Sequence, residues 1–112
     1  MRKMYEQVVT KSGWSASIQA SSHSYCHPRQ DRGCRYSSVE IGFPSEPDPL
    51  ITPYAEDPND LTGTVYGWVP AEIVTALLVK HGDVVSGEVP PLYISPTAAA
   101  NLAGILESVQ RG

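Results

Sequence analysis

Apolar and polar residues alternate strictly along two stretches in the first half of the chain, residues 14–27 and 34–43. Alternation with a period of two is typical of a strand that buries one face. The turn-forming sequence PRQDRG separates the two runs, so together they predict a long antiparallel hairpin. The side chains expected to face the core are Trp14, Ala16, Ile18, Ala20, Val39, Ile41 and Phe43.

Three other stretches also predict strands. Residues 4–10 form a first strand that ends in the turn KSG, where Gly13 can adopt a positive φ. Residues 62–69 form another strand. Residues 89–94 contain two prolines, which an edge strand tolerates because it needs fewer backbone donors.

Apolar residues recur at helical spacing in two later segments, about 70–81 and 96–110. Each begins with a proline in its first turn, and Gly82 follows the first as a C-cap. Strands first and helices last predict an α+β fold in one domain, residues 1–112. We expect an antiparallel sheet of about four to five strands, built on the long N-terminal hairpin, with both helices on one face.

The segment between the hairpin and the 62–69 strand is unusual, because residues 44–60 contain five of the ten prolines. Proline lacks an N–H group and biases the preceding residue toward extended geometry. We therefore expect a long acidic loop, largely without regular structure, anchored by Leu50, Ile51 and Tyr54. Its carboxylates are those of Glu46, Asp48, Glu56, Asp57 and Asp60.

Charge is distributed unevenly along the chain, which has a net charge of −4. Residues 1–35 carry six Lys and Arg against two acidic residues, whereas residues 36–79 carry seven acidic residues and no Lys or Arg. Such a separation favours charged partners. It predicts that the acidic loop meets a partner protein with a basic surface, imitating nucleic-acid phosphates.

The segment 23–34, HSYCHPRQDRGC, holds both cysteines and two of the three histidines. It leaves three interpretations open: a metal site, a disulfide and an ordinary hairpin tip. Zinc is the one cofactor with candidate ligands, although C-x7-C is not a usual knuckle. In a strand, the two histidines would lie about 13 Å apart and could not share an ion. The candidate ligands are His23, Cys26, His27 and Cys34.

The register of the hairpin determines which side chains lie on the outer face of its tip. Closing the hairpin around PRQDRG pairs Cys26 with Arg35 and His27 with Cys34, so the two cysteines face opposite sides and a disulfide needs a bulge. The outer face then carries polar, aromatic and cationic groups that suit a nucleic acid, a nucleotide or an acidic protein patch. These groups are His23, Tyr25, His27, Cys34 and Tyr36, with Arg29 and Arg32 in the loop.

Sequence motifs for catalysis are lacking. The chain has no G-x-S-x-G, Walker A, G-x-G-x-x-G or H-E-x-x-H sequence. His81 suits a structural place at a helix C-terminus, and both Trp14 and Trp68 lie in strand patterns as expected core or sheet-face residues. The sequence therefore predicts a protein that binds and not an enzyme.

The C-terminal segment YISPTAAANLAGILESV, about 17 residues, resembles the ends of small uncharacterised phage and actinobacterial proteins. Compact acidic phage proteins of this size are often inhibitors of host machinery, including anti-CRISPR and other anti-defence proteins. The resemblance implies an inhibitor of a host nucleic-acid or defence enzyme. The cytoplasm is the expected compartment, because the charged N-terminal segment contains no apolar stretch typical of a signal peptide. Alternatives are a nucleotide or nucleic-acid binding module and a zinc-stabilised domain.

Two surfaces are the expected binding sites, and the hairpin tip is also a candidate for contact between copies of the chain. No apolar run approaches the roughly 20 residues that cross a bilayer, so no membrane partner is expected. The expected binding residues are Tyr25, His27, Arg29, Arg32 and Tyr36 at the tip, with Glu46, Asp48, Glu56, Asp57 and Asp60 in the loop.

Overall fold

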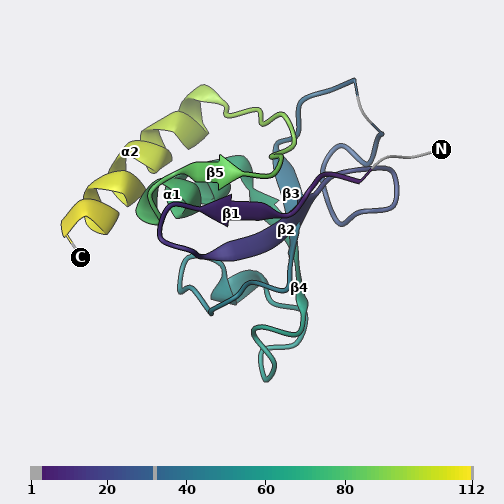
Figure 1. Cartoon of the computed structure of the whole chain (residues 1–112). Helices are drawn as coiled ribbons and strands as arrows, with labels where there is room; N and C mark the ends of the chain where they lie inside the picture. Colours follow the sequence, from purple (N-terminus) through teal and green to yellow (C-terminus); the bar gives the residue numbers. More distant parts are fainter. Residues whose placement is uncertain (1–3, 32, 112) are drawn as a thin grey trace.

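The computed structural model describes residues 4–31 and 33–111. Over this part of the chain, a five-stranded antiparallel sheet is combined with two helices, which confirms the predicted α+β class (Figure 1). The strand order is β4-β3-β2-β1-β5. The elements are β1 (Val8–Thr10), β2 (Ser15–Gln19), β3 (Ser38–Gly42), the 3-10 helix η1 (Thr52–Tyr54), β4 (Val65–Pro70), α1 (Ala71–Lys80), β5 (Val84–Ser86) and α2 (Pro96–Arg111).

The hairpin of β2 and β3 is much shorter than the predicted strands 14–27 and 34–43. Ile18 lies opposite Ile41, so inward-facing positions pair as expected, but the register is two residues away from the predicted one. Beyond Gln19 the chain turns because serine side chains bond locally: Ser21 Oγ lies 2.9 Å from Ser24 Oγ, and Ser24 N–H donates to Ser21 O. Farther along, the two segments form an isolated bridge between His27 and Ser38.

The prediction of an edge strand at residues 89–94 was wrong. In the structure, β5 is the edge strand next to β1, and residues 89–94 contribute only an isolated parallel bridge between Leu92 and Tyr36. The adjacent prolines Pro90 and Pro91 have no N–H groups and cannot sustain a ladder. This segment instead runs from β5 toward α2 (Figure 1).

The helices and turns agree with the predicted pattern. Helix α1 buries its apolar stripe in the core, and α2 packs along α1. Gly13 and Gly82 both adopt positive φ, 96° and 90°, as expected for the turn after β1 and the end of α1. The predicted loop 44–60 contains one short 3-10 helix, η1, and Ile51 anchors the loop in the core.

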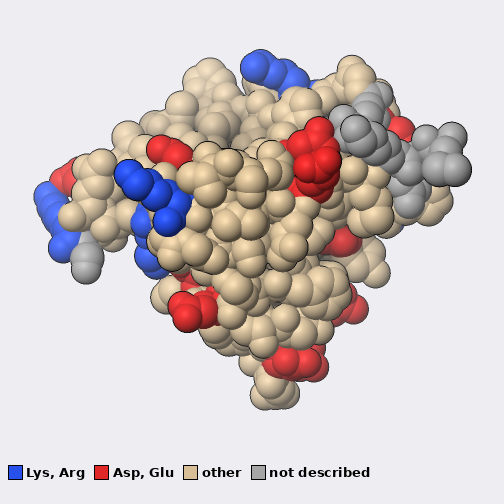
Figure 2. Space-filling view, viewed as in Figure 1, with Lys and Arg blue, Asp and Glu red and all other residues tan. Residues whose placement is uncertain are grey.

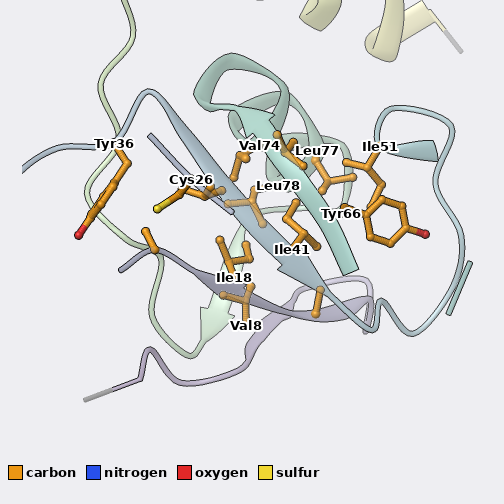
Figure 3. Packing of buried hydrophobic residues seen from close by; sticks show 14 of the residues in the cluster. Val8, Ile18, Cys26, Tyr36, Ile41, Ile51, Tyr66, Val74, Leu77 and Leu78 are labelled. Carbon is orange, nitrogen blue, oxygen red and sulfur yellow. The ribbon is translucent and has the colours of Figure 1, made fainter. Parts of the chain in front are cut away.

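The hydrophobic core lies between the sheet and α1 and is elongated. Figure 3 shows Cys26 and Tyr36 toward one end of the buried cluster and Ile51 and Tyr66 toward the other. Phe43, which we expected in this core, is 58% exposed, because its φ of +50° turns the side chain away from the face of Val39 and Ile41.

Candidate functional site

Two aromatic side chains stack on each other at the surface near β4. The rings of Tyr25 and Trp68 lie 5.0 Å apart between centroids at an interplanar angle of 25°. They are 37% and 51% exposed, which is unusual for residues of this size. The guanidinium carbon of Arg29 lies 5.8 Å from the centroid of the Tyr25 ring. We call Tyr25, Trp68 and Arg29 the aromatic shelf.

A β-bulge in β4 turns Trp68 outward. Val39 pairs with Val69 and Ile41 with Tyr66, so β4 holds one more residue than β3 between these pairs. Trp68 adopts φ +50°, a left-handed conformation that is rare for a bulky side chain. Bulges of this kind redirect side chains and are frequent beside functional sites.

Backbone contacts hold the shelf in place. Trp68 N–H donates to the Tyr25 carbonyl at 2.9 Å, and Tyr25 N–H donates to the Glu40 carboxylate at 3.0 Å. Gly67 allows Tyr25 to cross β4 closely, because a Cβ at this position would lie 3.2 Å from the Tyr25 Cβ. The segment that contains Tyr25 is thereby fixed against two strands.

A cavity of about 340 Å³ opens beside the shelf. Three aromatic rings and one carboxylate surround it, a combination that suits a cationic group. Its lining residues are Tyr25, Tyr54, Glu56, Gly67 and Trp68. Tyr54 belongs to η1 and Glu56 follows it, so the predicted acidic loop supplies one wall.

Four carboxylates of that loop lie at the surface as predicted: Glu46, Glu56, Asp57 and Asp60. Figure 2 shows acidic side chains on the lower part of the molecule, where Figure 1 places the segment that leads into β4. Asp57 and Asp60 cap turns there; Asp57 accepts from Asn59 N–H at 3.0 Å, and Asp60 N–H donates to Asp57 O.

Asp48 differs from its neighbours and corrects our expectation that it meets a partner. It is 2% exposed, and its carboxylate accepts hydrogen bonds from Leu50 N–H at 2.9 Å, Lys80 Nζ at 3.1 Å and His81 Nε2 at 2.8 Å. Burial alone would raise the pKa of this carboxyl group, but the three donors outweigh burial and hold the pKa below its usual value. Asp48 therefore joins the acidic loop to the end of α1.

The hairpin tip is only partly the predicted surface. Tyr25, His27 and Arg29 are exposed as expected, whereas Arg32 lies outside the described residues. Tyr36 is fully buried, so its placement on the outer face was wrong; its hydroxyl donates to Gln30 O at 2.7 Å, and burial raises its pKa. The bridge to Leu92 explains this burial, because residues 89–94 cover the Tyr36 segment.

The four candidate metal ligands do not converge. Cys26 is buried in the core and Cys34 packs at its margin, both as free thiols, while His23 and His27 are exposed. Across residues 4–31 and 33–111, no group of three or more His, Cys, Asp or Glu side chains is arranged to hold a metal ion.

Sequence reasoning missed Trp68, Tyr54 and Gly67 as site residues. We expected both Trp14 and Trp68 as core or sheet-face residues. Trp14 is 4% exposed, but the bulge brings Trp68 to the surface. An isolated glycine within a strand pattern is a known signal for a bulge, and Gly67 directly before Trp68 is that signal. Tyr54 reaches the site only through the fold of the proline-rich loop.

Neither helix of the described chain combines the length and apolar character needed to cross a membrane. Comparison with protein-family models, curated proteins and solved structures gave no match. The site is therefore interpreted from its own geometry.

Proposed function

We propose that this protein binds a partner protein by accepting a cationic side chain, arginine or lysine, in the cavity beside the aromatic shelf. The observation that carries the proposal is the lining of that cavity: the rings of Tyr25, Tyr54 and Trp68 with the carboxylate of Glu56. Exposed Trp and Tyr residues are also the side chains that most often dominate binding energy at protein interfaces.

The Tyr25 ring of the aromatic shelf already contacts a cation of the same chain. Arg29 already places its guanidinium over the Tyr25 ring. Ring faces attract cations electrostatically, by about 0.5–2 kcal/mol depending on solvation. Glu56 adds a negative charge to the lining, so a second guanidinium entering the cavity would meet both an aromatic wall and a counter-ion.

The surrounding charge extends this preference beyond the cavity. Asp57 and Asp60 lie one and four positions after Glu56 in the exposed loop, and Glu46 is exposed earlier in the same loop. An acidic surface of this kind accelerates encounter with a basic partner and weakens as salt is added. An inhibitor that covers the basic groove of a nucleic-acid or defence enzyme would use such a surface.

Nucleic-acid binding at the same place is the less favoured function. The rings could stack on bases, but Glu40 and Glu56 flank them and would repel phosphates. The buried Tyr36 cannot contribute a further ring. A single-stranded oligonucleotide therefore serves as a comparison ligand in the test.

The test uses a short arginine-rich peptide and the same peptide with citrulline, which is neutral and nearly isosteric. We expect the arginine peptide to quench Trp fluorescence saturably at low salt and the citrulline peptide to bind much more weakly. Trp68→Ala should weaken binding about 3- to 30-fold, the range that corresponds to a cation–π contact. Glu56→Gln should also weaken binding of the arginine peptide. In Trp68→Ala the remaining fluorescence comes from Trp14, so calorimetry measures the affinity of that variant.

Tyr93→Ala is the matched control, because Tyr93 is an exposed aromatic residue outside the cavity lining. It should bind the arginine peptide like the wild type. Equal affinity for the citrulline peptide, or full affinity in Trp68→Ala, would contradict the proposal. Tighter binding of the oligonucleotide than of the arginine peptide would favour the nucleic-acid function.

A further inference from the structure

A serine, a histidine and an aspartate from three separate segments form a second cluster, at the opposite end of the acidic loop from the shelf. Ser12 lies in the turn between β1 and β2, and His81 ends α1. Ser12 Oγ is 3.3 Å from His81 Nδ1, and His81 Nε2 is 2.8 Å from Asp48 Oδ2. The segments are also tied by the backbone, since Ser12 N–H donates to His81 O at 3.0 Å.

The buried carboxylate fixes which imidazole nitrogen carries the proton. Asp48 is ionised and accepts from Nε2–H, so the neutral ring presents the lone pair of Nδ1 to the Ser12 hydroxyl. The Trp14 ring stacks on the imidazole at 4.8 Å and 15°, which holds the plane of the ring. The backbone N–H of Trp14 also donates to Ser12 Oγ, at 3.4 Å.

Ser12 is accessible to a reagent. It is exposed and lines a cavity of about 480 Å³ with His81 and Trp14, and Gly13, Ser45 and Glu46 complete the wall. Thr10 Oγ1 lies 3.3 Å from Ser12 Oγ and donates its own proton to Trp14 O. Toward Ser12, the Thr10 hydroxyl can therefore act only as a hydrogen-bond acceptor.

We propose that Ser12 is an activated nucleophile that takes an acyl group from an ester or thioester, with His81 as its general base. Ser12 Oγ bonds to the acyl carbon while its proton passes to His81 Nδ1. The carbon–oxygen or carbon–sulfur bond of the donor then breaks, and the leaving alcohol or thiol receives that proton. The arrangement corresponds to a serine–histidine–aspartate triad with the two ring nitrogens exchanged.

The N–H groups of Ser12 and Gly13 donate to His81 O and Thr10 O, so neither can stabilise an oxyanion. Missing oxyanion donors slow both the acylation of Ser12 and the hydrolysis of the acyl-serine, each by about 100- to 1000-fold. The acyl-serine is an unactivated alkyl ester, so its hydrolysis should be slower than its formation from an activated ester or a thioester. The modified protein should therefore accumulate. The proposal does not rest on partner binding at the aromatic shelf.

The test treats the full chain with p-nitrophenyl acetate, follows release of p-nitrophenolate and locates the acetyl group by peptide mass mapping. We expect a burst stoichiometric with the protein, followed by slow turnover, with acetyl on Ser12. Ser12→Ala should abolish the burst. His81→Gln, which keeps an amide donor for Asp48 but has no base, should slow it about 100-fold.

Ser86→Ala is the control, because Ser86 is an exposed serine of β5 outside the cavity lining; it should react like the wild type. Circular dichroism establishes that each variant is folded, and Ser12→Ala alters only an exposed side chain. Acetyl found on Lys11 with none on Ser12, or an unchanged burst in Ser12→Ala or in folded His81→Gln, would overturn the proposal.

Discussion

The two cysteines, eight positions apart in the sequence, lie in different environments. Cys26 is fully buried, and its thiol is within hydrogen-bonding distance of Ser21 O at 3.2 Å and Pro28 O at 3.4 Å. Burial raises the pKa of the Cys26 thiol, which lowers the fraction of reactive thiolate at neutral pH. Cys34 is partly exposed at the margin of the core.

We therefore expect iodoacetamide to alkylate Cys34 in the folded protein and to reach Cys26 only after unfolding. Mass mapping over a time course at neutral pH measures both rates in one sample. In urea sufficient to unfold the chain, the two thiols should react at similar rates. Equal rates in the folded protein would contradict the burial of Cys26.

At the scale of elements, the bulge in β4 holds Trp68, a residue of the proposed binding site, in a strained backbone conformation. A non-glycine residue with positive φ costs about 1–3 kcal/mol, and such strain is frequent at functional sites. Trp68 carries this conformation at an exposed position, so the rest of the sheet has to maintain it. The same positive φ turns Phe43 out at the end of β3.

Comparing Trp68→Gly with Trp68→Ala separates strain from stacking. Both variants lose the ring, but glycine tolerates φ +50° and alanine does not. After allowing for the greater chain entropy of glycine, we expect Trp68→Gly to be more stable than Trp68→Ala by about 1 kcal/mol. Urea unfolding measures the difference. A less stable glycine variant would argue against backbone strain at this position.

At the scale of the whole molecule, Asp48 links the acidic loop to the C-terminal end of α1. Its contacts with Lys80 and His81 join residues more than 30 positions apart. The Tyr54 ring and the Glu56 carboxylate follow Asp48 in the same loop. The position of one wall of the aromatic cavity therefore depends on this ion pair.

The stability of the protein should depend on the ionisation of Asp48. Its pKa is lower in the folded chain than the usual value of about 3.9, so folding is stabilised at pH values above that value. This contribution is lost as the pH falls below about 4 through the lower, folded pKa. We expect Asp48→Asn to cost about 2–3 kcal/mol at pH 7 and to weaken the acid dependence.

Urea unfolding of the wild type and of Asp48→Asn between pH 7 and pH 3 tests this prediction. The two curves should converge toward the acid end. Asp57→Asn is the control, because Asp57 is exposed in the same loop, and it should follow the wild type at pH 7. Parallel curves for Asp48→Asn and the wild type would show that another group governs acid stability.

The sequence alone determined the α+β class, both helices, the glycine turn after α1, the inward positions of β2 and β3 and the irregular proline-rich loop. These features follow from local patterns, because periodicity, proline and glycine act within a few residues. Strand lengths were overestimated, since serine side chains after Ala20 compete locally with the ladder.

Only the tertiary structure decided the chemistry of the surface. The burial of Asp48 and Tyr36, the exposure of Trp68 and the approach of Ser12 to His81 all depend on segments that are distant in the sequence. Two of these residues lie where we did not expect them: Asp48 is buried instead of belonging to the acidic surface, and Tyr36 is buried in the core instead of lying on the outer face of the hairpin tip. Long-range pairing sets these positions, because one extra residue in β4 changes which side chains face solvent.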